Sequence, residues 1–317
     1  MPQASSLYQS PLLSQIAVDF KNREYIADRV LTPVTVPKML GQYLVWDRGV
    51  TFKLPKTEMA QNAVANMLDV FATKSSFQLK THALQAVIDE LEREQAPEAQ
   101  IEAMKTVKLT NALQLQKEID VAAPLCSASV ITQTTDLSST DIWSDPASTP
   151  INDIQTAHAA LPRRGNTLIV GRDTYDTLRT NKQILTALQF TAAAGLASME
   201  QLARLFEVDR ILVGDAVKDT AGENLAATNR LVWQESGNGG MALLCYVDSS
   251  PPSPLMDQPT LGYLPTMGGA GPTFRTYRYV DPTAGTGAGV TRIKVETAYA
   301  PLISAPSMAY LFTSCVS

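Results

Sequence analysis

The sequence has few of the residues with which enzymes bind metals or form covalent intermediates. Only two histidines and three cysteines occur in 317 residues. Neither histidine lies in an HExxH motif, and Cys126, Cys245 and Cys315 are too far apart to form a four-ligand zinc motif. Three scattered cysteines also argue against the disulfide framework of a small secreted domain. We therefore expect no metal, no cofactor and no catalytic residue, and we assign His82 and His158 to structural positions.

Positive charge and long apolar runs are also scarce. Lys and Arg number 26 against 31 Asp and Glu, which gives a formal net charge of −5. This balance provides no general attraction to nucleic acid or to anionic lipid. No apolar run approaches membrane-spanning length, and the first residues lack the basic and apolar regions of a signal peptide. These absences predict a soluble protein that is made in a cytoplasm and has no membrane partner.

The length and the low charge content point to a large, associating protein. A chain of 317 residues exceeds the size at which one hydrophobic core stops growing, so more than one lobe is expected. Charged residues make up only 18% of the chain, as expected where much of the surface faces partner subunits. Residues 1–38 are punctuated by prolines and predict an extended arm that buries little by itself.

The first half of the chain predicts a hairpin and two helices. Residues 41–54 contain two β-prone runs on either side of a turn signal at Asp47–Gly49. Residues 76–95 carry apolar side chains at helical spacing and predict a helix. Pro97 and Pro124 bound the longest helix, which should be roughly 39 Å long. Its apolar face is expected to contain Ile101, Met104, Leu109, Ala112, Leu115, Ile119 and Ala122.

The second half predicts a mixed α and β lobe followed by glycine-rich loops between strands. More than half of the 17 glycines lie between Gly237 and Gly289, where turns are expected. The segment SMEQ has the spacing of a capping box, and Asp173 is expected to cap the helix that follows it. The expected elements are helices at 153–161, from 173 and from 198, and strands from 166, at 210–213, 273–280, 291–300 and 308–316.

Gly171 raises the question of a phosphate-binding turn, because NTLIVGRDTYDTLRTNKQIL reads as strand, glycine and helix. Neither GxGxxG nor GxxxxGK[ST] surrounds this glycine, so the sequence predicts a structural corner instead. A GxSxG nucleophile motif is also absent. Trp46, Trp143 and Trp233 lack a surrounding basic pattern, which favours packing over base stacking.

Several phrases resemble the major capsid proteins of tailed bacteriophages, which share the Hong Kong 97-type fold. The phrases are IWSDPASTPINDIQTAHAAL, the Gly171 segment, MEQLARLFEVDRILVGDA, LVWQES and ALLCYV, and they occur in the order found in that family. ADRVLTPVTVPKMLGQYLVW resembles the family's arm leading into its extended loop, and the proline-bounded helix resembles its spine helix. The chain departs from the family at Glu207, where glycine is frequent, and at Asn181 and Lys182, which replace a His-Pro-like step.

The resemblance implies an α+β fold and a structural role without enzyme activity. The implied division is an N-terminal arm (1–38), an extended loop (39–75), a peripheral domain (76–150) with its spine helix (97–123), an axial domain (151–290) and return strands (291–317). The subunit would assemble into pentamers and hexamers of an icosahedral shell around double-stranded DNA. It would belong to the virion and be assembled in the cytoplasm of the bacterial host.

The resemblance also implies partners. The main partner is the chain itself, and packaged DNA would be confined without specific binding. Because the sequence begins almost directly with the arm, a separate scaffolding protein is expected, together with a portal at one vertex and decoration proteins as a further option. Charges of the loop at Arg48, Lys53, Lys56 and Glu58 could serve contacts between subunits, but no crosslink is assigned to the lysines. Deleting 42–67 should leave a folded subunit that builds no shells.

Two alternatives stay open at this level. An encapsulin-type bacterial compartment has a similar shell fold but encloses protein cargo, so purified particles without a genome would favour it. An α/β enzyme belongs to a different class of function. Stable monomers with a buried ligand pocket would favour the enzyme.

Overall fold

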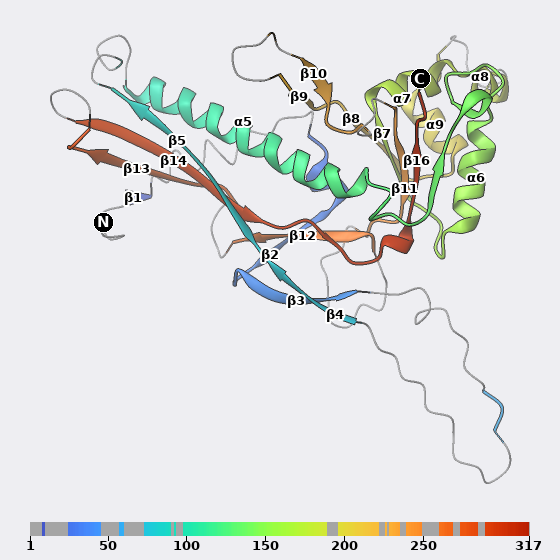
Figure 1. Ribbon diagram of the computed structural model, residues 1–317, viewed down its shortest axis with the longest axis horizontal. Helices are drawn as coiled ribbons and strands as arrows, with labels where there is room; N and C mark the ends of the chain where they lie inside the picture. The colour runs from blue at the N-terminus through green and yellow to red at the C-terminus, as the bar shows by residue number, and fades with distance from the viewer. Residues whose placement is uncertain are drawn as a thin grey trace.

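The computed structural model describes residues 8–9, 25–45, 57–59, 73–89, 92, 98–188, 196–221, 226, 228–234, 239–248, 260–268, 273–284 and 289–316. Two bodies of secondary structure lie side by side along the long axis (Figure 1). One is a long twisted sheet with a single helix along it, and the other is a five-stranded sheet with four helices. No helix in these ranges is both long and apolar enough to cross a bilayer.

The long sheet is built around one hairpin. β13 (Arg275–Asp281) and β14 (Val290–Tyr299) pair antiparallel, which confirms the prediction of strands at 273–280 and 291–300. β14 pairs on its other side with β5 (Lys80–Ile88), from Thr291 opposite Ile88 to Tyr299 opposite Lys80. The sheet is completed by β1 (Tyr8–Gln9), β2 (Thr32–Val36), β12 (Gly262–Met267) and β15 (Leu302–Ile303).

The helix α5 (Glu98–Leu125) packs along this sheet against β5 and β14. With 28 residues it is about 42 Å long, which confirms the long helix predicted between the two prolines. Pro124 does not stop it as expected, because a proline in the last turn blocks little of the hydrogen-bond ladder, and the Cys126 amide still donates to the Ala122 carbonyl at 2.9 Å.

The predicted apolar face of this helix is partly wrong. Met104 is 54% exposed and Ala112 is also exposed, although both were expected to be covered. Four polar side chains are buried instead, namely Thr106, Thr110, Lys117 and Glu118. The helix is covered by the twisted sheet along one part and by the five-stranded body at its C-terminal end, so its buried side changes direction along its length.

The prediction of a helix at 76–95 is wrong. Within this range the structure has the last three residues of β4 (Thr73–Gln78) and all of β5. Their apolar spacing fits a helix, but the full-length pairing of β5 with β14 overrides this local signal. Because β5 lies at an edge, several of its side chains are exposed on both faces, and it lacks the simple alternation that would identify a strand.

The predicted hairpin around Asp47–Gly49 is found only in part. The first run forms β3 (Leu40–Val45), which pairs antiparallel with β4, with Val45 opposite Thr73. The turn and the second run lie outside the described residues. The strands that are seen to pair are therefore further apart in sequence than a tight hairpin requires.

The end of the predicted arm is deeply anchored. It contains α2 (Ala27–Val30) and β2, which pairs parallel with β12. Ile26, Ala27, Val30 and Leu31 are all at most 4% exposed and belong to the largest hydrophobic core. The sequence predicted that 1–38 buries little by itself, and the burial of this segment is indeed supplied by the body of the protein, whose apolar side chains surround it.

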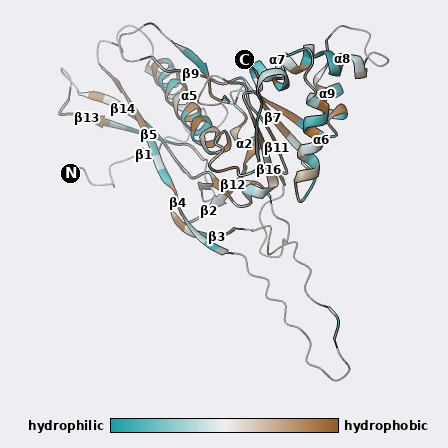
Figure 2. Ribbon diagram, turned by 45° about the vertical axis from the view of Figure 1, so that its right-hand side comes forward, coloured by the Kyte–Doolittle hydropathy of each residue, from teal (hydrophilic) through white to brown (hydrophobic). Residues whose placement is uncertain are grey.

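The second body is a five-stranded sheet in the order β6 (Thr134–Asp136), β16 (Ala309–Thr313), β11 (Ala242–Cys245), β7 (Thr167–Gly171) and β8 (Arg210–Gly214). Figure 2 shows how apolar the central strands are, and every residue of β7 and β11 is buried. Its helices are α6 (Pro150–Ala160), α7 (Arg172–Thr180), α8 (Lys182–Leu188) and α9 (Met199–Leu205). The strands and helices predicted for this region are confirmed.

Two helix starts test the capping predictions. The Ser198–Gln201 capping box precedes α9 with both reciprocal hydrogen bonds, as predicted. Asp173, by contrast, is not the N-cap of α7, because Gly171 takes that position and Asp173 lies in the first turn. There its carboxylate still faces the positive end of the helix dipole.

Smaller elements complete the chain. A two-stranded hairpin of β9 (Val217–Asp219) and β10 (Asn229–Leu231) follows β8, and single 3-10 turns lie at Ser139–Asp141 and Pro306–Met308. The chain passes between the two bodies more than once, since β12 belongs to the long sheet and β16 to the five-stranded sheet. The division into arm, extended loop, peripheral and axial domains stays a prediction.

Candidate functional site

A buried carboxylate joins three segments that are far apart in sequence. Glu118 lies near the C-terminal end of α5 and is 0% exposed. Its carboxylate oxygens accept the backbone amides of Ile26 at 3.0 Å and Ala27 at 2.9 Å. The Trp233 indole Nε1 donates to the same carboxylate at 2.5 Å. The start of α2, the long helix and the segment after β10 therefore meet at one side chain, which we call the Glu118 junction.

Burial controls the electrostatics of this junction. Removal from water raises the pKa of Glu118, while the hydrogen bonds from Ile26, Trp233 and Ala27 oppose that shift. A neighbouring ion pair also joins α5 to α2, since Lys117 Nζ lies 2.7 Å from the Asp28 carboxylate. The helix thus holds α2 twice, through a buried carboxylate that binds backbone amides and through an ammonium group that binds a side chain.

Trp233 packs closely against two glycines, with its backbone carbonyl at Gly171 and its side chain at Gly214. Gly171 and Gly214 end the parallel strands β7 and β8 and lie opposite each other in the register. A Cβ atom on Gly171 would lie 2.5 Å from the Trp233 carbonyl oxygen, and one on Gly214 would lie 2.3 Å from the ring. Gly171 is therefore a structural corner, as predicted, and the reason is the close approach of Trp233.

We expect Gly214→Ala to destabilise the subunit by about 1–3 kcal/mol, because the added methyl group overlaps the Trp233 ring in a packed core. Urea denaturation of unassembled subunits, followed by circular dichroism, measures this. The cost should fall sharply in a Trp233→Ala background, where the overlapping ring is gone. Equal costs in both backgrounds would show that the ring is not the cause.

The phrase beginning IWSDP forms a hydrogen-bonded corner of the second body. Trp143 is buried, and its Nε1 donates to Asp153 at 2.9 Å. The Asn181 amide donates to the Trp143 carbonyl at 3.1 Å and to the Ser148 hydroxyl at 2.9 Å. Asn181, one of the departures from the family pattern, thus fastens the end of α7 to this corner. Trp143 and Trp233 are packing residues, as predicted, whereas Trp46 lies outside the described residues.

The two histidines do not share a site. His82 lies on β5 and not in a helix, and its ring stacks on Tyr299 with centroids 4.7 Å apart. Its Nε2 is 3.8 Å from the Asp120 carboxylate, which also accepts the Tyr299 hydroxyl at 2.7 Å. His158 is buried in α6, where burial lowers its pKa and its Nε2 lies 2.9 Å from the Phe206 carbonyl.

The cysteines form no disulfide, and Cys245 and Cys315 are buried. Burial raises the pKa of the Cys245 thiol to about 12, which keeps it protonated and unreactive. In the part of the chain that the structure describes, no three His, Cys, Asp or Glu side chains gather as metal ligands would.

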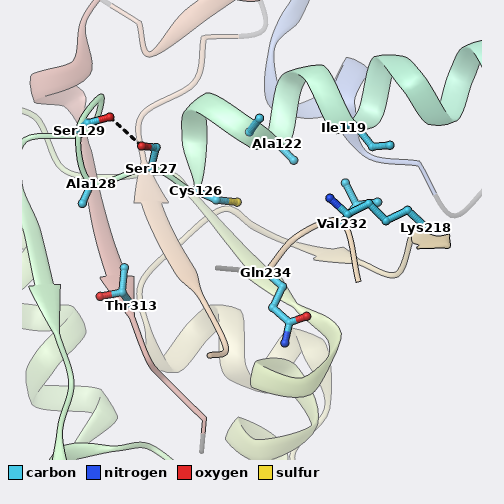
Figure 3. Close-up of a pocket in the computed structure, with 11 residues that line it drawn as sticks. Ile119, Ala122, Cys126, Ser127, Ala128, Ser129, Lys218, Val232, Gln234 and Thr313 are labelled. Carbon is cyan, nitrogen blue, oxygen red and sulfur yellow. Dashed lines mark hydrogen bonds between the residues drawn. The ribbon is translucent and has the colours of Figure 1, made fainter. Parts of the chain in front are cut away.

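A hollow of about 470 Å³ lies beside the Glu118 junction, between the end of α5, the base of the β9–β10 hairpin and β16 (Figure 3). Ser127 and Ser129, whose hydroxyls are 2.8 Å apart, stand at one end, and Lys218 and Gln234 line other parts of the wall. The polar groups do not converge on one point, so this hollow lacks the nucleophile, base and orienting group of a catalytic site.

One feature of the sequence points to the Glu118 junction. Lys117 and Glu118 interrupt the apolar spacing of a helix whose neighbouring residues are buried. A charged pair at such a position is either exposed or paired inside the protein, and only the tertiary contacts reveal which applies. Of the loop charges, Glu58 is exposed, and Arg48, Lys53 and Lys56 lie outside the described residues.

Solved structures with this architecture include a phage-related protein and a phage capsid. A phage-related protein from Bordetella bronchiseptica RB50 superposes with a TM-score of 0.75 at 22% identity, covering 99% of this chain and 98% of that one. The capsid protein of cyanophage P-SCSP1u superposes with a TM-score of 0.55 at 12% identity, over 94% and 90% of the two chains. The protein therefore has the Hong Kong 97-type fold, as the resemblance implied.

The sequence comparison narrows the class further. No family model matches the sequence. The major capsid protein of Pseudomonas phage JBD67 is 31% identical over 212 residues, which cover 65% of this chain and 68% of that protein. The chain belongs to the family of phage major capsid proteins.

Proposed function

We propose that this chain is the repeating subunit of an icosahedral phage head, in which pentamers and hexamers enclose a double-stranded DNA genome. The observation that carries the proposal is the 31% identity to a curated major capsid protein, together with a fold that superposes on a cyanophage capsid. In the virion the protein would form the capsid wall, after assembly in the cytoplasm of the bacterial host. Its principal partner would be further copies of the same chain. Its role would be structural, and it would have no enzyme activity.

The surface charges support confinement of DNA without specific binding. The strands β13 and β14 carry several cations, and three of them, Arg278, Arg292 and Lys294, are paired with carboxylates. Arg292 lies 3.0 Å from Asp281, and Lys294 lies 2.7 Å from Glu296. Cations that are paired within the subunit release few counterions when a phosphate approaches. Together with the net charge of −5, this supports a wall that encloses the genome and does not grip it.

Ring formation has a simple physical basis in this proposal. A head-to-tail contact between different surfaces of identical subunits closes into a ring when its rotation permits. Each contact can be weak, because a subunit held by several neighbours leaves only when all the contacts open together. A scaffolding protein, a portal and decoration proteins are the further partners that the resemblance implies.

Electron microscopy of the expressed full chain tests the proposal. We expect hollow polyhedra or capsomer rings, produced by the chain alone or when its genomic neighbours are co-expressed. Particles that enclose protein cargo and no genome in the natural host would favour an encapsulin-type compartment. A chain that stays monomeric with and without its neighbours would contradict the proposal.

A further inference from the structure

The strands β4 and β5 follow each other almost without interruption, and each is paired on a different edge. β3 pairs with β4, and β14 pairs with β5. The Leu79 amide, between the two strands, donates to the Met39 carbonyl at 2.8 Å, on the β3 side. β3 follows this edge of β4 only as far as Leu79. The same edge continues along β5, where β3 is no longer beside it.

The direction of the backbone groups can be followed along this edge. The amide and carbonyl of a strand residue point to the same side, and the side alternates from one residue to the next. Because Leu79 faces the β3 edge, Thr81, Ala83, Gln85 and Val87 face it too. The Val87 carbonyl fits this pattern, since it binds Lys105 Nζ at 2.5 Å and not β14. In the described ranges, no strand pairs with β5 on this side.

This edge lacks the usual protection against strand addition. Natural edge strands are kept short, or carry charges, prolines or bulges. β5 has nine residues, KTHALQAVI, with no proline and with Lys80 as its one formally charged residue. Leu84 is 40% exposed and Val87 is 41% exposed. A nine-residue edge with one formally charged residue, at its first position, and with exposed apolar side chains favours addition of another strand.

We propose that the outer edge of β5 is a β-augmentation site, filled by an extended segment of a second copy of this chain. The incoming segment would continue the line of β3 and take the backbone groups of Thr81, Ala83 and Gln85. Pairing with the backbone of β5 requires that the incoming segment be extended. The exposed apolar side chains of β5 favour an incoming segment without charged side chains. A second copy is the partner that assembly supplies on every side, so this inference rests on the proposed function.

The variant Ala83→Pro tests the site. Proline removes an amide that faces outward, so no hydrogen bond to β14 is lost, while its ring blocks an incoming strand. Ala83→Val is the matched control, because it keeps the amide and suits a strand. We expect folded Ala83→Pro subunits whose particle yield, measured by sedimentation and microscopy, falls on the order of tenfold or more. Ala83→Val should assemble like the wild type.

The outcomes separate this inference from the proposed function. If the wild type forms no particles, the shell proposal fails. If wild type and Ala83→Pro form equal numbers of particles, the shell proposal stands and the β5 site is wrong. Loss of assembly in both Ala83 variants would also contradict the site, since the cause would then be the side chain.

Hydrogen exchange on the wild type keeps the test decisive if Ala83→Pro fails to fold. The amides of Thr81, Ala83 and Gln85 should exchange at least about tenfold more slowly in particles than in unassembled subunits. The amides of His82 and Ala86, which face β14, should be protected in both states and serve as internal controls. If the exchange rates of the Thr81, Ala83 and Gln85 amides were the same in particles and in unassembled subunits, the proposal would be overturned. If these amides became protected only when a different protein was co-expressed, the segment that fills the site would not come from a second copy of this chain.

Discussion

Replacing Glu118 by alanine should lower the free energy of unfolding of the subunit by roughly 3–5 kcal/mol, the usual cost of removing one partner from a buried charged network. The change leaves the amides of Ile26 and Ala27 and the Trp233 indole without their acceptor in the core. Each buried donor without a partner costs about 1–3 kcal/mol. Denaturation of unassembled subunits by urea, followed by circular dichroism, measures the loss.

Gln116→Ala is the matched control for this variant. It lies on the same helix, two residues away, and removes only an exposed hydrogen bond to Asp120. We expect its effect to stay within about 0.5 kcal/mol, as for most surface substitutions. If Glu118→Ala were as stable as this control, the Glu118 junction would not hold the N-terminal segment in place.

The pH dependence of the junction follows from the direction of its pKa shift. Burial raises the pKa of Glu118 above 4.5, so the folded chain binds this proton more tightly than the unfolded chain. The resulting contribution to stability is complete below the ordinary pKa and is lost as the pH rises through the folded pKa. Glu118→Gln has no such titration. The stability of the wild type relative to Glu118→Gln should therefore increase as the pH is lowered from neutral toward about 4.5.

Replacing residues 46–72 by the dipeptide Asn-Gly should leave a folded subunit that builds no shells. Val45 and Thr73 lie opposite each other in the β3–β4 ladder, so a two-residue turn can join them without disturbing the pairing. The expected loss of assembly follows from the role that the family resemblance implies for the extended loop, namely contact with neighbouring subunits. This boundary improves on deletion of 42–67, which would remove most of β3.

Two measurements are needed to interpret the shortened chain. Circular dichroism and thermal unfolding should be close to those of the full chain, since both large cores lie outside the removed segment. Electron microscopy should then find no closed shells under conditions in which the full chain forms them. Normal shells from the shortened chain would show that this loop is dispensable for assembly.

Local sequence patterns predicted the second body well. The run TLIV before Gly171 and the capping box at Ser198 each fix a local conformation by backbone or packing chemistry that lies within a few residues. The same holds for the β13–β14 hairpin. Asp173 shows the limit of this reasoning, because the N-cap position is taken by Gly171, two residues earlier than the local pattern indicated.

The strand β5 and the Glu118 junction required tertiary information. The β5 sequence fits a helix as well as a strand, and the choice is made by β14, which lies more than 200 residues later. Glu118 is buried only because residues 26–27 and Trp233 bring three donors to it across 92 and 115 positions of sequence. No pattern within the helix itself encodes those partners.

The amino-acid sequence by itself determined the class of this protein, because its composition left few routes to catalysis and its phrases in the second body match a capsid family. Only the tertiary structure decided how the N-terminal segment is anchored and that β5 is a strand paired with β14. The physical reason is the range of the interactions. Caps, turns and hydrophobic periods act between near neighbours in the chain, whereas buried hydrogen bonds and strand pairing depend on residues that meet only after folding.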